Sequence, residues 1–343
     1  ELFNDGKLSE EPPATQMDLS RSIELYETIL KRFPGYERND AVQYLWAYCQ
    51  AEIGEIERER DGFLALVRNY PDSQFRTEAW LRVGENYFDE DMLCEALDAY
   101  SKVLSDTESS LYDKALYKVA WTHYKLDRFE DAVGRFFQLV DFAEERAKKT
   151  GQRGSDVRTE AIQYLAISAT EDRWGRPRVP ETLEGCREVT AGDESWDEQE
   201  ILAQEEREAR GIPEPPKVQP HERLGMMFEK AGEKPYRREI YNEVANVIYD
   251  MQAFNLYIPL ARKLIEIEPM HPDNPQITWN LILALDQLGE DTRTEAALER
   301  EKLNAAYGPG SPWQEANENR PSKIRQAMRF AQDALSSSAL FRF

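Results

Sequence analysis

An aromatic residue returns every 37 residues in the first half of the chain, at Tyr26, Phe63, Tyr100 and Phe137. An aliphatic residue follows three positions after each of them, at Ile29, Leu66, Val103 and Val140. A period of roughly thirty to forty residues is typical of stacked helical hairpins, because one hairpin cannot bury its own apolar face and must pack against the next. We therefore predict an all-α protein, a right-handed α-solenoid of stacked antiparallel helix hairpins.

Breaks in the helical periodicity divide the chain into five predicted parts. Between the two sets of hairpins lies an acidic stretch that ends in prolines, which we expect to be partly helical and mobile and to be inserted between two helices of one hairpin. The parts are an irregular N-terminal segment (1–19), N-terminal hairpins (20–171), the acidic, Pro-rich insertion (172–219), C-terminal hairpins (220–305), and a loop with a capping helix (306–343).

The two ends of the sequence carry expectations of their own. The chain opens Glu1-Leu2-Phe3, without an initiator Met, which predicts either a processed mature end or the boundary of a fragment. The closing run Leu340-Phe341-Arg342-Phe343 is too apolar for a free end. We expect it either to dock on the last hairpin or to continue into further chain.

The charge balance favours some partners over others. The chain has 65 acidic and 43 basic residues, which gives a formal net charge of −22. A field of this sign repels phosphate backbones, so nucleic acid is a poor partner, and it attracts basic or extended protein segments. No apolar run is long enough to cross a bilayer, so we expect no transmembrane span.

The sequence offers no constellation for catalysis or metal binding. Its three histidines lie in separate segments, and its three cysteines show no spacing typical of a zinc site or a disulfide framework. We expect Cys49 and Cys94 to be small packed thiols inside helices. The prediction is a non-enzyme with no catalytic residue, no metal and no cofactor.

Large side chains recur on the predicted first helices at positions that hairpin packing does not require. In a solenoid of this kind the first helices line the concave wall, and Trp80, Val83, Gly84 and Tyr87 fit the stripe that packs between hairpins. The neighbouring stripe is either a partner-binding groove or a surface that other segments cover. Its residues are Tyr44, Tyr48, Leu81, Glu85, Phe88, Tyr117, Trp121 and Tyr124, and further along the chain Asn242, Asn246 and Trp279.

One hairpin carries a recognisable motif. The run Trp80-Leu81-Arg82-Val83-Gly84-Glu85-Asn86-Tyr87, followed by Ala96 and Tyr100, resembles the tetratricopeptide repeat family. The turn Arg68-Asn69-Tyr70-Pro71-Asp72-Ser73 is similar to those of bacterial cell-envelope repeat proteins, including outer-membrane assembly lipoproteins and periplasmic proteins of myxobacterial gliding motility. This resemblance implies a non-catalytic, protein-binding scaffold of a cell-envelope complex with a periplasmic location.

A second function fits the same family. Some of its members are cytoplasmic peptide-motif receptors or chaperone adaptors, which clamp a carboxylate with basic groove residues. Here Lys114 and Lys125 are the only basic residues at the groove positions of the first helices. The acidic residues Glu78, Glu85 and Asp89 occupy neighbouring groove positions. The sequence does not match the clamp, so the adaptor ranks below the scaffold as the alternative function.

Overall fold

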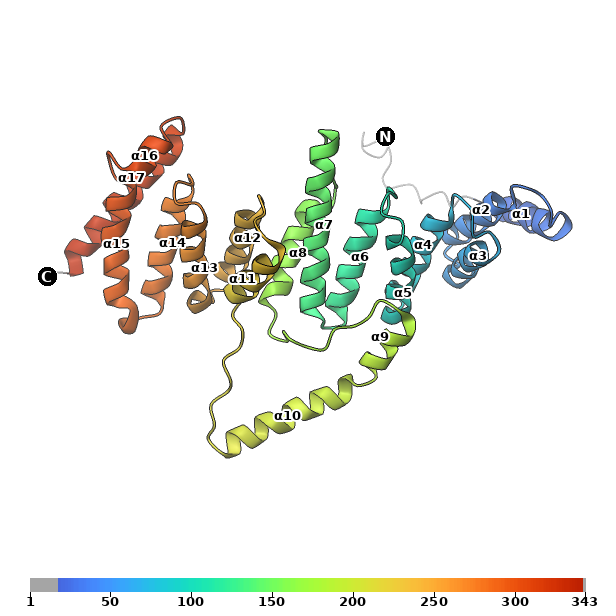
Figure 1. Ribbon diagram of the computed structural model, residues 1–343, viewed down its shortest axis with the longest axis horizontal. Helices are drawn as coiled ribbons and strands as arrows, with labels where there is room; N and C mark the ends of the chain where they lie inside the picture. The colour runs from blue at the N-terminus through green and yellow to red at the C-terminus, as the bar shows by residue number, and fades with distance from the viewer. Residues whose placement is uncertain (1–17, 342–343) are drawn as a thin grey trace, which may run out of the picture. The chain divides into compact units, whose positions relative to one another are not determined.

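The computed structural model of the protein describes residues 18–341, and within that range it consists of helices joined by turns and loops, without a strand (Figure 1). The prediction of an all-α chain is confirmed. The helices follow one another as consecutive packed pairs. The expectations for residues 1–17 and for Arg342-Phe343 lie outside the described residues.

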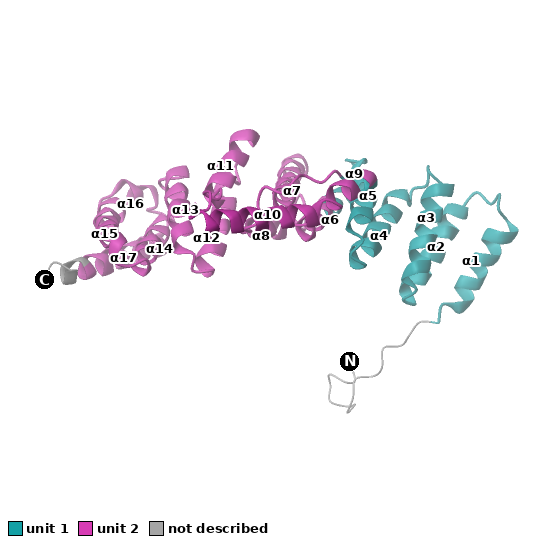
Figure 2. Ribbon diagram, turned by 90° about the horizontal axis from the view of Figure 1, so that it is seen from below, with its two compact units in different colours: residues 1–115, 181–183 teal, residues 116–180, 184–343 magenta. Residues whose placement is uncertain are grey.

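The chain forms two compact units (Figure 2). Unit 1 comprises residues 1–115 and 181–183, and unit 2 comprises residues 116–180 and 184–343. Within unit 1 each helix packs on the next one in the chain. Its helices are α1 (Ser20–Arg32), α2 (Asn39–Glu52), α3 (Ile56–Asn69), α4 (Arg76–Asp89) and α5 (Leu93–Leu104).

Unit 2 begins inside α6 (Tyr112–Lys125). Helix α8 packs on α7, on α11 and on α12, and the series continues through α13, α14 and α15 to α17. Because α11 contacts α8, α12 and α13, it fills the second-helix place after α8, with α9 and α10 inserted between them. The helices are α7 (Phe129–Thr150), α8 (Arg158–Thr170), α9 (Leu183–Thr190, of which Leu183 belongs to unit 1), α10 (Asp193–Ala209), α11 (Pro220–Ala231), α12 (Arg237–Asp250), α13 (Phe254–Ile267), α14 (Asn274–Gln287), the 3-10 turn η1 (Glu290–Thr292), α15 (Arg293–Tyr307), α16 (Pro312–Ala316) and α17 (Pro321–Phe341).

The 37-residue repeat marks the core. Phe63, Tyr100 and Phe137 are 1%, 0% and 8% exposed, which places one aromatic ring inside each of three successive second helices. Burial of such a side chain contributes about 1.5–3 kcal/mol. Tyr26 holds the same position in α1 but is only half-buried, because no helix precedes α1 in the described part of the chain.

The turn inside a hairpin has one recurring geometry. The residue two positions before the second helix adopts positive φ, at Gly54 (80°), Asp91 (58°), Asp127 (56°) and Gln252 (58°). The N–H that follows each of them donates to a carbonyl five residues back, as in Met92 N to Tyr87 O at 2.9 Å. This pairing closes a helix with a left-handed residue in the Schellman manner. Of these four residues only Gly54 is a glycine, so only there does the sequence itself indicate the positive φ.

The cysteines differ from their prediction. Cys94 and Cys186 are disulfide-bonded, whereas Cys49 is buried and free. The expectation of a packed thiol is therefore wrong for Cys94. Spacing along the sequence cannot show which cysteines are close in space, since a disulfide needs only that the two sulfurs meet.

Candidate functional site

Helices α6 and α8 bring four aromatic side chains of unit 2 together. The ring of Tyr164 lies 4.3 Å from that of Trp121 and 6.3 Å from that of Tyr117, measured between centroids. The ring of Tyr124 lies 5.4 Å from that of Trp121. All four side chains are half-buried and keep part of their surface in solvent. We call Tyr117, Trp121, Tyr124 and Tyr164 the aromatic cluster.

Buried rings and one hydrogen bond hold the aromatic cluster in place. Phe136, fully buried in α7, lies 6.0 Å from Tyr117 and 6.3 Å from Tyr164. The hydroxyl of Tyr124 donates to Glu171 Oε1 at 2.6 Å. Burial and this carboxylate raise the pKa of Tyr124 to about 12, so the donor stays protonated at neutral pH. The cluster is a preformed surface.

The sequence pattern identified three members of the aromatic cluster and missed the fourth. Tyr164 lies within the predicted N-terminal hairpins (20–171), but it was not among the predicted groove residues. The available signal was that Tyr164 lies on α8, the first helix of the next hairpin after α6 and α7. Tyr164 also supplies the closest ring contact of Trp121, so α8 covers part of the predicted stripe.

In unit 1 the predicted wall begins with two tyrosines of α2. The ring of Tyr44 stacks on Phe75 at 4.6 Å, and its hydroxyl donates to Glu78 Oε1 at 2.8 Å. Burial, followed by the bond to Glu78, raises the pKa of Tyr44 to about 12. Tyr48, one turn further along α2, is exposed. This part of α2 therefore presents one ring that is held by stacking and one exposed ring.

Helix α4 supplies a more polar part of the predicted wall. Leu81 is buried and serves as a core contact, where the sequence pattern placed it on an open groove. Phe88 is half-buried, and Glu85 lies 3.7 Å from Arg82. Val83 and Gly84 are buried, as the predicted packing stripe requires. The accessible face of α4 is thus mainly charged.

The predicted residues near the C-terminal end do not form one surface of a single kind. Asn242 is half-buried and Asn246 is exposed on α12. Trp279 of α14 stacks on Phe330 of α17 at 5.4 Å, with the rings 11° from parallel. It packs beside a buried cluster that joins α14, α15 and α17. Trp279 therefore packs against the capping helix α17. This agrees with the alternative that other segments cover the predicted stripe.

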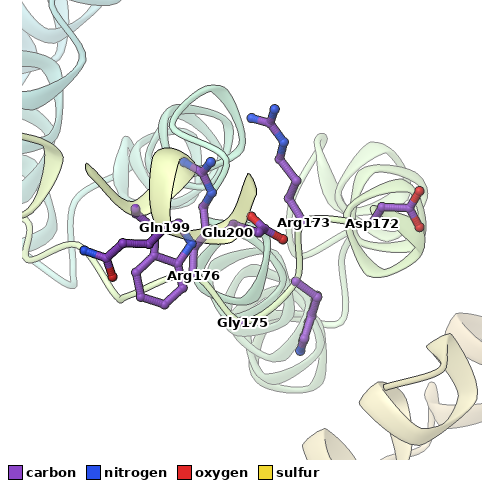
Figure 3. Close-up of a pocket in the computed structure, with 8 residues that line it drawn as sticks. Asp172, Arg173, Gly175, Arg176, Gln199 and Glu200 are labelled. Carbon is purple, nitrogen blue, oxygen red and sulfur yellow. The ribbon is translucent and has the colours of Figure 1, made fainter. Parts of the chain in front are cut away.

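The insertion forms a polar pocket of about 280 Å³ within unit 2. Figure 3 shows the loop side chains Arg173 and Arg176 beside Gln199 and Glu200 of α10. Arg176 also bonds to Asp197, and the fully buried guanidinium of Arg128 bonds to Asp193. Two carboxylates therefore anchor the first turns of α10 to buried cations.

Two kinds of site have no counterpart in the described residues. Within 18–341 no group of three or more histidine, cysteine, aspartate or glutamate side chains is placed to hold a metal ion. Over the same range, no helix combines the length and the apolar character needed to cross a membrane.

Comparisons with known proteins give one sequence match. Residues 41–73 match the profile of the tetratricopeptide repeat. This segment covers most of α2 and all of α3, and further helix hairpins follow it in the described chain. The chain therefore contains a tetratricopeptide repeat at these residues. No curated protein matches it.

Several solved structures match the chain at low identity and low TM-score. A tetratricopeptide repeat protein from Parabacteroides merdae is 12% identical, with 96% of this chain and 94% of that chain covered and a TM-score of 0.38. The TPR2AB domain of yeast Sti1 in its pHSP90 complex is 10% identical over 85% and 98%, with a TM-score of 0.29. BtubC from P. vanneervenii is 13% identical over 83% and 89%, with a TM-score of 0.30. At these values the structural matches add nothing to the repeat found at residues 41–73.

Proposed function

We propose that the protein is a non-catalytic scaffold that binds an extended segment of a partner protein on the accessible faces of its first helices. The aromatic cluster carries this proposal. Its four rings are aligned by Phe136 and by the Tyr124–Glu171 bond, yet they keep exposed surface. Rings that are already ordered lose little conformational freedom when a partner covers them, which is why aromatic residues dominate binding hot spots.

The charge of the chain favours a basic or extended partner. The net charge of −22 creates a field that speeds the approach of a cationic segment. On the first helices of unit 1, Glu78 accepts the Tyr44 hydroxyl and Glu85 stands beside Arg82. A partner there would meet carboxylates next to phenol rings, whereas at the aromatic cluster of unit 2 it would meet mainly rings.

We further propose a cell-envelope complex as the setting, in outer-membrane assembly or gliding motility. The turn Arg68–Ser73 supports this through its resemblance to envelope repeat proteins. The disulfide-bonded state of Cys94 and Cys186 agrees with an oxidising compartment, because cytosolic thiols are kept reduced. A periplasmic location follows as part of the proposal.

The test is partner capture with matched variants. Trp121→Ala combined with Tyr164→Ala removes the closest ring pair of the aromatic cluster, and Trp196→Ala removes an exposed indole on α10 as the control. Each protein is used to capture partners separately from envelope and cytoplasmic fractions of the source cells. We expect envelope proteins that bind wild type and the control but not the double variant, with unchanged helicity by circular dichroism.

Other outcomes contradict the proposal. Equal capture by all three proteins removes the aromatic cluster from the function. Capture of cytoplasmic chaperones through their C-terminal tails would instead support the adaptor alternative and reject the envelope location. A loss of helicity in the double variant would make Trp121 and Tyr164 core residues.

A further inference from the structure

Unit 2 contains a second pocket, of about 550 Å³, away from the first-helix faces. It lies between α7 and α11 and is bounded by the end of α8 and by the loop that carries Trp174. Its walls are mainly apolar and include Val133, Phe137, Leu224 and Met227. Since α7 and α11 are second helices, this pocket is separate from the aromatic cluster on α6 and α8.

A buried cation forms part of the wall. Arg223 is 6% exposed, and its Nη1 donates to the carbonyls of Ala169 at 2.8 Å and Glu171 at 2.7 Å. Its Nε donates to Val218 O at 2.9 Å, and its guanidinium lies 4.7 Å from the ring centre of Trp174. These hydrogen-bond partners are neutral, and the carboxylates of Asp172 and Glu171 act on the guanidinium without any ion pair to it within the described contacts. A buried charge held in this way favours an anion beside it.

The rim of the pocket adds positive charge. Arg178 pairs with Glu130 at 2.8 Å, and Lys230 is exposed on α11. The lining therefore has three cations, Arg178, Arg223 and Lys230, and one carboxylate, Glu130. In a chain with a net charge of −22 this is a local reversal of sign. Charge complementarity selects an anionic occupant.

We propose that the pocket between α7 and α11 binds an acidic segment of a partner protein, which inserts a large apolar side chain between Phe137 and Leu224 and places its carboxylates near Arg223 and Lys230. Met226, 52% exposed, and Met227 lie on the same lining. Methionine side chains adapt their shape to irregular apolar partners. This site lies beyond the proposed first-helix function, so the two can fail independently.

One glycine makes the proposal testable without damage to the fold. Gly134 of α7 lines the pocket, and a Cβ built on it meets no heavy atom within 4 Å. Leucine there fills the cavity from an exposed helix position. Gly225 of α11 is equally open but does not line the pocket. Gly225→Leu is therefore the matched control.

The experiment measures fluorescence anisotropy with the full chain and a fluorescein-labelled hexapeptide, Glu-Glu-Leu-Trp-Glu-Glu. We expect wild type and Gly225→Leu to bind it alike, within about twofold, because neither loses pocket volume. Gly134→Leu should weaken binding by about tenfold or more, because the apolar side chain of the probe loses its buried contacts. Lys230→Glu should weaken it by roughly three- to tenfold, because a rim cation becomes an anion.

Several results would overturn the proposal. The proposal is wrong if wild type does not bind the acidic peptide, or if wild type binds a peptide with lysines in place of the glutamates equally well. It is also wrong if Gly134→Leu binds the acidic peptide as tightly as wild type does. Dodecanoate that displaces the probe more effectively than the unlabelled acidic peptide would assign the pocket to a free amphiphile. Circular dichroism of each variant confirms that loss of binding does not reflect loss of helices.

Discussion

Gly84 lies where α4 and α5 approach each other closely. A Cβ built on it would lie 2.4 Å from Cε1 and 2.6 Å from Cδ1 of Tyr100. Tyr100 is fully buried, so its ring has no space into which it can move. This contact gives a physical reason for glycine in the motif at residues 80–87. Gly134, also helical, has open space where its Cβ would stand.

The two glycines predict opposite responses to alanine. Gly84→Ala should destabilise the protein by about 1–3 kcal/mol, because it overpacks a closed contact. Gly134→Ala should stabilise it by up to about 1 kcal/mol, because alanine favours a helix more than glycine does. Thermal unfolding of both variants beside wild type measures the difference. Shifts of the same sign would contradict the assigned role of Gly84.

His271 shows how burial sets a protonation state. Its Nδ1 accepts the backbone N–H of Asp273 at 3.2 Å, which requires an unprotonated nitrogen. Burial, and then the nearby Arg238, lower the pKa of His271 below 6.5. Protonation is therefore easier in the unfolded chain. Stability contributed by the neutral ring is complete above the unfolded pKa and is lost as pH falls through the folded pKa.

We accordingly predict that the melting temperature of the wild-type protein has a component that rises with pH from below the folded pKa of His271 up to about 6.5. His271→Gln should lose that component, because glutamine does not titrate. Melting curves between pH 5 and pH 8 measure it, and an NMR titration of the imidazole gives the pKa directly. An NMR pKa above 6.5 would reverse the expected sign.

At the scale of elements, α10 is held by charge and hardly by apolar packing. No residue of α10 is buried, and Ile201 and Leu202 are 56% and 63% exposed. Its contacts with the cations Arg128 and Arg176 come from Asp193 and Asp197 in its first turns. The insertion is therefore helical, as predicted in part, and anchored at one end.

Among the contacts that hold α10, the ion pair between Asp193 and Arg128 should contribute most to docking. Asp193→Ala leaves the fully buried Arg128 without its carboxylate, and we expect a loss of about 1–3 kcal/mol in the docking of α10. Glu206→Ala, which breaks the exposed pair with Arg210 in the same helix, should change docking by less than about 1 kcal/mol. Limited proteolysis within residues 193–209 compares them. Equal cleavage of the two variants would show that the Arg128 pair does not hold α10.

At the scale of the whole molecule, packing is local along the chain. Each helix of unit 1 contacts its neighbours in sequence, and the series from α12 to α15 does the same within unit 2. Stability in such an arrangement is a sum of hairpin and neighbour terms, so a defect remains near its origin. A core substitution in one hairpin should therefore leave distant hairpins nearly unchanged.

Hydrogen exchange of the Gly84→Ala variant tests this locality. We expect faster amide exchange in α4 and α5, where Gly84 meets Tyr100, and exchange rates in α13 and α14 close to those of wild type. Gly134→Ala serves as the control that perturbs no contact. Uniformly faster exchange across both units would show that the chain unfolds as one cooperative body.

Helix positions and their inward faces were readable from the linear order of residues. The pattern began the helical hairpins at residue 20 and placed Trp80, Val83, Gly84 and Tyr87 on one helix, where the structure has α1 (Ser20–Arg32) and α4 (Arg76–Asp89). It also identified the buried ring series and the Gly84 contact. These features are local, because helical periodicity and hairpin length decide which side chains must leave water.

Proximity between distant residues was decided by the way the helices stack. Tyr164 beside Trp121, Asp193 on Arg128, and the neutral partners of Arg223 all join positions that no periodicity links. The disulfide-bonded state of Cys94 belongs with them. Periodicity assigns a side chain to a face of its helix, whereas the residue opposite depends on which helices become neighbours and on the path of the insertion. The candidate binding surfaces therefore emerged from tertiary packing, although most of the helices that build them could be predicted in advance.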